Sequence, residues 1–207
     1  FLWAYDSSLK AIPYDPAEAR AMLDAAGWKP GPDGIRVKNG QRLHIAVAIT
    51  TGNAVGNRVS VQLQSAWKEI GVELEIKQYA SALMFANYES GGILQAGKFD
   101  VAFASWVNGV DPDDSTTLVC SALPPNGQNI YRLCDKQLEA DEQVALTHYD
   151  QAARKKAYDD VQARLLNELP FLTMWFNRRF DIVSVDVKNY KPAHAVTTFW
   201  NTWEYDI

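Results

Sequence analysis

The feature that most constrains the fold is a strand, a helix and a second strand in close succession. LHIAVAIT (43–50) is mostly apolar, and VELEIKQ (72–78) alternates apolar and polar side chains. Between them a helix is predicted to begin near Asn57 and to end at Gly71. Its apolar side chains recur at helical spacing: Val59, Leu63, Trp67 and Ile70. This order predicts a βαβ unit with parallel strands and a right-handed crossover.

The third predicted strand runs directly into a polar loop. FDVAFASW (99–106) is nearly all apolar, which is typical of a strand covered on both faces. After Trp106 the chain continues as VNGVDPDD, with Asn108 and Asp111. Ligands of open α/β sheets bind beyond the carboxyl ends of the strands, and an aromatic side chain beside hydrogen-bonding groups suits a small molecule. We therefore expect ligand contacts around Trp106; the alternative is a strand that merely ends at the surface.

Capping and turn signals assign the other elements. Asp15 and Pro16 start a helix that ends at Gly27, and Asn39-Gly40 centres a hairpin turn. Further helices are expected over 81–95 (broken at 91–92), 136–146 and 150–169, paired strands over 171–179 and 180–185, and an isolated strand over 199–206. The second long helix should turn Tyr158, Val161, Leu165 and Leu169 inward. The chain is therefore predicted to be a mixed α/β lobe.

Composition excludes several classes of protein. With 47% hydrophobic and 22% charged residues, the 207-residue chain can bury a core. The net charge of −5, without a block of like charge, argues against a nucleic-acid partner. No apolar run approaches the roughly 18 residues of a membrane span. The chain begins at Phe1 as though cut from something longer, so the missing export signal carries little weight.

The two cysteines, Cys120 and Cys134, bracket a loop that contains proline and glycine. With no other cysteine to compete, a disulfide is favoured over two free thiols, and a disulfide would indicate an exported protein. No clustered histidine or cysteine ligands accompany the pair, so neither a metal nor another cofactor is expected.

An enzyme is the first alternative function. The histidines, His44, His148 and His194, have no partner at a catalytic spacing, and no nucleotide-binding or nucleophile motif is present. TGNAVGN (51–57) favours a plain strand-to-helix loop over an anion site, because it lacks a lysine or an acidic partner. A carboxylate-based glycoside hydrolase would use Asp111 with Asp113 or Asp114. Acids around a proline are more often turn formers and helix caps, and Asp114 could cap a short helix.

A protein-interaction module is the second alternative. Four aromatic side chains lie close together near the end of the chain: Phe199, Trp200, Trp203 and Tyr205. Their exposure would create an apolar patch of the kind that binds other proteins. We expect that exposure to result from truncation, in which case the fragment would self-associate while the full chain stays monomeric.

Several stretches in the same order resemble the family 5 extracellular solute-binding proteins. These stretches are WAYDSSLKAIPYDPAEARAMLDAAGW, DGIRVKNGQRL, SVQLQSAWKEIGVELEI, FDVAFASWVNGVDPDD, QNIYRLCDKQLEADEQ and QAARKKAYDDVQARLLNELPFLTMWF. The resemblance covers essentially the whole chain. Members are periplasmic or lipid-anchored receptors of ABC importers for peptides, nickel and some oligosaccharides, and they have two lobes that close on the ligand.

The resemblance implies an α/β, periplasmic-binding-protein-like class II lobe with a mixed sheet flanked by helices. Residues 1–190 would form the second ligand-binding lobe, and 191–207 would start the return to the first. The implied protein is not an enzyme; it is an exported, monomeric receptor, periplasmic or at the cell surface, that delivers a peptide or other small solute to permease subunits.

The resemblance also implies the site residues. Trp106 matches a tryptophan that lines the ligand cleft of peptide receptors, and Ser105, Val107, Asn108 and Asp111 would complete the rim. Asn108 stands where peptide receptors often carry an acid, and Arg58 is the residue nearest to their carboxylate-binding arginine. Both departures weaken a dipeptide assignment and leave longer peptides or oligosaccharides open. Dipeptide receptors share the cysteine pair, which supports a Cys120–Cys134 bridge.

Overall fold

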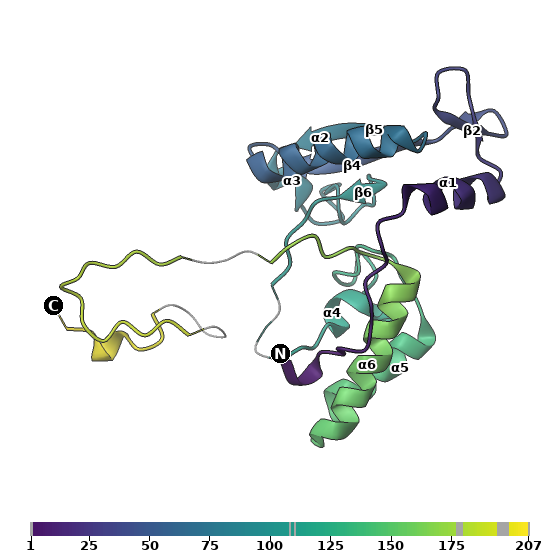
Figure 1. Cartoon of the computed structure of the whole chain (residues 1–207). Helices are drawn as coiled ribbons and strands as arrows, with labels where there is room; N and C mark the ends of the chain where they lie inside the picture. The colour runs from purple at the N-terminus through teal and green to yellow at the C-terminus, as the bar shows by residue number, and fades with distance from the viewer. Residues whose placement is uncertain (1, 108, 110, 177–179, 194–198, 207) are drawn as a thin grey trace. The chain divides into compact units, whose positions relative to one another are not determined.

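The computed structural model describes residues 2–107, 109, 111–176, 180–193 and 199–206 (Figure 1). The chain divides into two compact units. Residues 10–106 and 116–132 form the first, called the sheet unit below. Residues 1–9, 107–115 and 133–207 form the second, called the helical unit.

A three-stranded parallel sheet organises the sheet unit, and it confirms the predicted βαβ unit. The central strand β4 (His44–Thr50) pairs in parallel with β5 (Glu73–Tyr79) on one side and with β6 (Val101–Ala102) on the other. The crossover helix α2 (Ala54–Glu69) begins three residues before the predicted start, because the Asn53 side chain accepts a hydrogen bond from Gly56 N at 2.8 Å and caps it.

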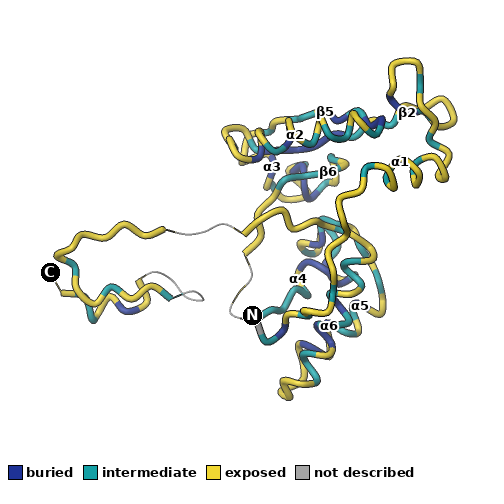
Figure 2. Tube along the Cα trace, viewed as in Figure 1, coloured by how far each residue is buried: buried dark blue, intermediate teal, exposed yellow. Residues whose placement is uncertain are grey.

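Both faces of the parallel sheet are buried, as the apolar run of β4 requires. On one face Val47, Ile49 and Leu74 pack with Leu63 and Trp67 of α2. On the other face Ala48 contacts a cluster formed by Met84, Ile93 and Leu94. Figure 2 shows buried residues along this sheet and exposed ones along the outer side of α2. The alternation of side chains along a strand directs neighbouring residues into the two layers.

A small antiparallel sheet precedes the βαβ unit. Its strands are β1 (Lys29–Pro30), β2 (Arg36–Lys38) and β3 (Gln41–Arg42), in that order. The predicted hairpin turn is confirmed, since Asn39 and Gly40 have φ of 52° and 79° between paired Lys38 and Gln41. Helix α1 (Pro16–Ala25) also begins at the predicted cap, where Asp15 Oδ1 accepts from Ala17 N and Glu18 N at 2.9 Å each.

The predicted helix over 81–95 is wrong beyond its first turn. Helix α3 ends at Met84 (Ser81–Met84), and the chain then makes turns in which Asn87 Oδ1 accepts from Ser90 N. Gly92 N donates to Asn87 O, and a Cβ on Gly92 would lie 1.9 Å from the Ala86 carbonyl oxygen. This close approach of two backbone segments, possible only at glycine, replaces the expected helix.

The helical unit is built on two helices that pack side by side (Figure 1), α5 (Lys136–Thr147) and α6 (Gln151–Glu168). Both were predicted, and the carboxylates of Asp135 and Asp150 cap them. Their shared core contains Ala4, Ala145, Ala157 and Tyr158, with Trp3 packed against it. Short 3-10 turns of this unit lie at Leu2–Ala4 and Thr202–Glu204. Loop 107–115 leads into α4 (Ser115–Leu118), which begins at the last residue of the loop and continues into the sheet unit, where a 3-10 turn follows at Cys120–Ala122.

The prediction that Leu169 turns inward is wrong, because Leu169 is the exposed left-handed C-cap of α6, with φ of 50°. Val161 and Tyr158 are buried as predicted, and Leu165 is half-buried. The inward stripe therefore ends about one turn before the helix does. Pro170 follows the cap and prevents its continuation.

The paired strands predicted over 171–185 are absent from the described part of that segment. Residues 171–176 and 180–185 form no ladder, and most of their large apolar side chains are exposed. An isolated two-stranded ribbon is barely stable in water, so these sequences need a neighbouring surface to become strands. The tail prediction is also wrong within 199–206, where a turn and a 3-10 helix leave a single antiparallel bridge between Lys188 and Asp206.

Candidate ligand-binding site

The carboxyl ends of the three parallel strands meet at one edge of the sheet unit. Strand β4 ends at Thr50, β5 at Tyr79 and β6 at Ala102. The chain that leaves β4 forms the short loop 51–53 before α2, and the chain that leaves β6 leads to Trp106. The segment that carries Trp106 therefore begins at the edge where open α/β sheets bind ligands.

Strand β6 is shorter than predicted, which exposes the site residues at its end. The last hydrogen bond to β4 runs from Phe103 N to Ala48 O at 2.9 Å. Beyond it Ser105 is exposed, Trp106 is 54% exposed and Val107 is 88% exposed. Apolar packing supports the strand only as far as Phe103, so the chain leaves the sheet there. More than half of the Trp106 surface is therefore exposed.

Loop 107–115 belongs to the helical unit and is tied to helix α6 by Asp111. The Asp111 carboxylate accepts a hydrogen bond from Arg154 Nη2 at 2.6 Å and one from the Tyr158 hydroxyl at 3.2 Å. Arg154 Nε donates to Ala145 O at 2.7 Å, and its guanidinium lies 5.2 Å from the centre of the Trp3 ring. The carboxylate of Asp111 thus accepts its hydrogen bonds from side chains of the same chain.

The electrostatics of this cluster follow from those contacts. The hydrogen bond that Arg154 donates to Asp111 raises the pKa of Arg154 above its ordinary value, so the guanidinium stays charged. Burial raises the pKa of Tyr158 to about 12, so its hydroxyl keeps its proton and acts as a donor to Asp111. Cation–π contact with Trp3 and Tyr158 further fixes the arginine.

The other carboxylates of the loop take part in local structure. Asp113 Oδ1 accepts from Ser115 N at 2.9 Å, where the short helix α4 begins. Asp111 is committed to Arg154, as described above. The Asp113 contact agrees with the interpretation of that acid as a turn and cap residue. Asn108 lies outside the described residues.

The sequence patterns missed Arg154, and they assigned Tyr158 only to the core. The two residues stand one helical turn apart on α6, so their side chains point the same way. An arginine one turn before an inward tyrosine was the available signal. Its partner, Asp111, is 43 positions earlier in the chain, and only the fold brings them together.

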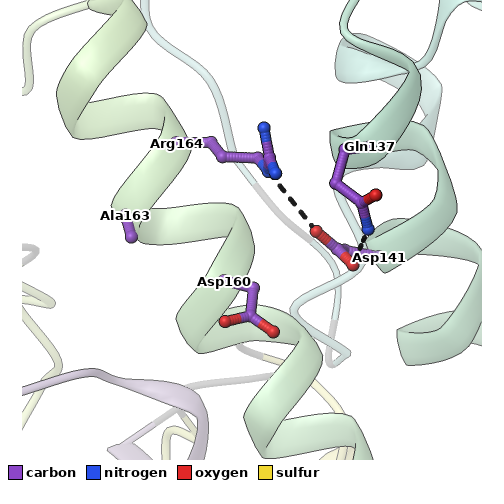
Figure 3. Close-up of a pocket in the computed structure, with 5 residues that line it drawn as sticks. All are labelled: Gln137, Asp141, Asp160, Ala163 and Arg164. Carbon is purple, nitrogen blue, oxygen red and sulfur yellow. Dashed lines mark hydrogen bonds and ion pairs between the residues drawn. The ribbon is translucent and has the colours of Figure 1, made fainter.

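Helices α5 and α6 also border an open depression of about 340 Å³. Figure 3 shows Asp141 of its lining linked to two neighbours: it accepts from Gln137 Nε2 at 3.0 Å and pairs with Arg164 at 3.6 Å. Asp160 and Ala163 complete the lining. Its charged side chains already form ion pairs, Asp141 with Arg164 and Asp160 with Lys156, so we assign no ligand to it. Within the described ranges, no three His, Cys, Asp or Glu residues are grouped to hold a metal ion.

Two further observations bear on the sequence predictions. Cys120 and Cys134 form a disulfide bond, which confirms the expected bridge. In the described part of the chain, no helix is both long and apolar enough to cross a membrane.

Comparison with known families decides the classification. The family described as "Bacterial extracellular solute-binding proteins, family 5 Middle" matches residues 1–127. The chain belongs to family 5 of the bacterial extracellular solute-binding proteins. This family 5 chain is 29% identical over 197 residues to Di/tripeptide-binding protein 2 of Pseudomonas aeruginosa strain UCBPP-PA14. That alignment covers 92% of the chain and 34% of the relative, so the chain spans about a third of the relative's length.

Solved structures share the fold of this family 5 chain. The oligopeptide binding protein from Thermus thermophilus, complexed with a pentapeptide, matches 98% of the chain with a TM-score of 0.83 and 26% identity, over 37% of its own length. NikZ from Campylobacter jejuni, in complex with Ni(L-His), matches 99% of the chain and 41% of its own length, with a TM-score of 0.79 and 24% identity. The predicted periplasmic-binding-protein-like α/β class is confirmed; among described residues the parallel and antiparallel strands lie in separate sheets.

Proposed function

We propose that this chain is one ligand-binding lobe of a two-lobed ABC-importer receptor for a peptide-like solute. The observation that carries the proposal is the match of 98% of the chain to an oligopeptide binding protein solved with a pentapeptide, at a TM-score of 0.83. The similarity to Di/tripeptide-binding protein 2 of Pseudomonas aeruginosa supports the same solute class. In this proposal residues 1–190 form the lobe and residues 191–207 begin the connection to the other lobe.

The proposed mechanism is binding without bond-making. The ligand contacts both lobes, and its preference for the closed form sets the closed population. Trp106 supplies an apolar face at the carboxyl edge of the sheet, and Ser105 offers a hydroxyl next to it. Val107, Asn108 and Asp111 form the rim in this proposal, with Asp111 acting through its bond to Arg154. Main-chain hydrogen bonds to a peptide backbone would tolerate varied side chains.

The proposed setting follows from the family. A receptor of this kind is exported to the periplasm or the cell surface and delivers its solute to permease subunits as a monomer. The disulfide between Cys120 and Cys134 supports an oxidising compartment. Fractionation of the natural host, with detection of the full-length protein outside the cytoplasm, tests the location.

The identity of the solute is tested on the full-length receptor purified from its own host. The protein is denatured, and released small molecules are identified by mass spectrometry. Released peptides support the proposal and show the preferred length. A released oligosaccharide would contradict the peptide assignment and make Trp106 a stacking platform for sugar rings. An empty extract calls for titration of the purified receptor with peptides of two to five residues and with oligosaccharides.

A further inference from the structure

Helix α5 carries a buried ionisable side chain, Glu142, that the proposed binding mechanism does not use. Glu142 is 1% exposed. Neither of its carboxyl oxygens has a side-chain hydrogen-bond partner among the residues that the structure describes, and the donor beside them is the backbone N–H of Asp114. Burying a charge without such a partner costs far more than burying a neutral acid, so this environment favours the protonated carboxyl group.

Loop 107–115 adds to this effect through its own acids. Burial is the main cause that raises the pKa of Glu142 to about 8, and Asp114, Asp113 and then Asp141 raise it further by charge repulsion. The Asp114 backbone N–H partly offsets the rise. From α6 the titratable neighbour is Tyr158, whose pKa burial raises to about 12, so Tyr158 stays neutral. Glu142 therefore faces acids from the loop and a neutral phenol from α6.

We propose that Glu142 is a positioning residue for loop 107–115: its protonated carboxyl group allows the loop to lie against α5, and loss of the proton displaces the loop and weakens ligand binding. An ionised Glu142 would add a negative charge beside Asp113 and Asp114 at a buried site where no described side chain donates to it. Outward movement of the loop relieves that cost because it admits water to the carboxylate. The inference rests on the proposed function only in assigning the loop to the ligand rim.

The loop's second attachment makes such a displacement consequential. Asp111, in the same loop, is held by Arg154 and Tyr158 of α6. A shift of residues 113–114, two and three positions after Asp111, therefore pulls on these two hydrogen bonds. The protonation of Glu142 is in this way linked to the attachment of Asp111, which the proposed function assigns to the rim.

The first test needs no ligand. Hydrogen exchange of the amides of residues 109–116 is measured in the full-length receptor and in its Glu142→Gln variant, at pH 6.5 and pH 9. Glutamine keeps the shape and stays neutral. At pH 6.5 we expect the two proteins to be equally protected. At pH 9 we expect these amides to exchange at least tenfold faster in the wild type than in Glu142→Gln. Equal protection at both pH values overturns the proposal. Glu139→Gln, a surface change on the same helix, is the matched control and should follow the wild type.

The second test measures binding with trialanine as the probe. The wild type should lose at least tenfold in affinity between pH 6.5 and pH 9, and Glu142→Gln should retain its affinity. If the affinities of both proteins change in parallel, the positioning role is overturned. If trialanine binds to neither protein at either pH, the peptide assignment fails for this probe, while the exchange experiment still decides the role of Glu142.

A third measurement uses the wild-type receptor, so it decides the proposal even if the Glu142→Gln variant does not fold. Carbon NMR of side-chain carboxyl groups in the wild-type receptor, with the Glu142 signal assigned from the variant or by its burial, gives its titration directly. A midpoint well above that of the exposed glutamates supports the proposal. A midpoint among them overturns it, because Glu142 would then be ionised at neutral pH with the loop in place.

Discussion

Arg154 on helix α6 donates to the carboxylate of Asp111 at 2.6 Å, across 43 positions of sequence. The contact gives loop 107–115 a fixed attachment to the helical unit. The side chain of Arg154 is 19% exposed and that of Asp111 is 51% exposed, so the pair is partly shielded from water. Arg154 also donates a hydrogen bond to Ala145 O and contacts the Trp3 ring, so this one side chain connects the loop, helix α5 and the N-terminal segment.

Replacing Arg154 should therefore destabilise the protein. Arg154→Lys keeps the charge but loses the planar donor set, and we expect a cost of about 1–3 kcal/mol in the free energy of unfolding. Urea denaturation of the full-length protein measures it. The control is Lys156→Gln on the same helix, where the ion pair with Asp160 is exposed and its loss should leave the free energy of unfolding nearly unchanged. Equal urea midpoints for Arg154→Lys and Lys156→Gln would contradict the structural role of Arg154.

Trp106→Ala should separate binding from stability. Because the side chain is 54% exposed, its loss should leave the unfolding midpoint nearly unchanged. Ligand affinity should fall at least tenfold, measured by calorimetric titration with the solute recovered from the native receptor. Tyr88→Ala removes another exposed aromatic of the sheet unit, 45% exposed, and should leave affinity unaltered. Unchanged affinity in Trp106→Ala would remove Trp106 from the site.

The stability of the protein should depend on pH through Glu142. Burial raises its pKa from the ordinary value of 4.5 to about 8. Between pH 4.5 and pH 8 the folded state therefore keeps a proton that the unfolded state has lost. The contribution of Glu142 is therefore complete below pH 4.5 and is lost as pH rises toward 8, at about 1.4 kcal/mol per pKa unit. Relative to the wild type, Glu142→Gln should become steadily more stable across this window in thermal unfolding. A constant difference would falsify the assignment.

Reduction of the disulfide should lower stability without changing the fold class. The bond between Cys120 and Cys134 closes a loop of about 15 residues, for which chain entropy predicts about 3 kcal/mol. The unfolding midpoint of the Cys120→Ala, Cys134→Ala double variant should fall accordingly. Mass spectrometry of the exported protein without reductant should show two fewer hydrogens than in the reduced chain. Free thiols at both positions would contradict the bridge.

Local sequence alone determined where helix α1 begins and where the hairpin turns. Asp15 caps α1 and Asn39-Gly40 turns the hairpin, because capping and positive φ are properties of the residues themselves. The βαβ unit was equally predictable, since the apolar pattern of residues 43–50 buries both faces of β4. The same patterns, in the same order, led to the family. They also predicted that Trp106 follows the third strand closely, although β6 ends at Ala102, four positions before it.

Tertiary structure decided where those elements end and which distant groups meet. Strand β6 ends early because support from β4 and the core stops at Phe103, and residues 171–185 form no strands in their described part because a strand needs a partner that their own sequence cannot supply. The attachment of Asp111 to Arg154 and the burial of Glu142 are invisible in a linear pattern. Hydrogen bonding and desolvation depend on which atoms lie close in space, and only packing sets those distances.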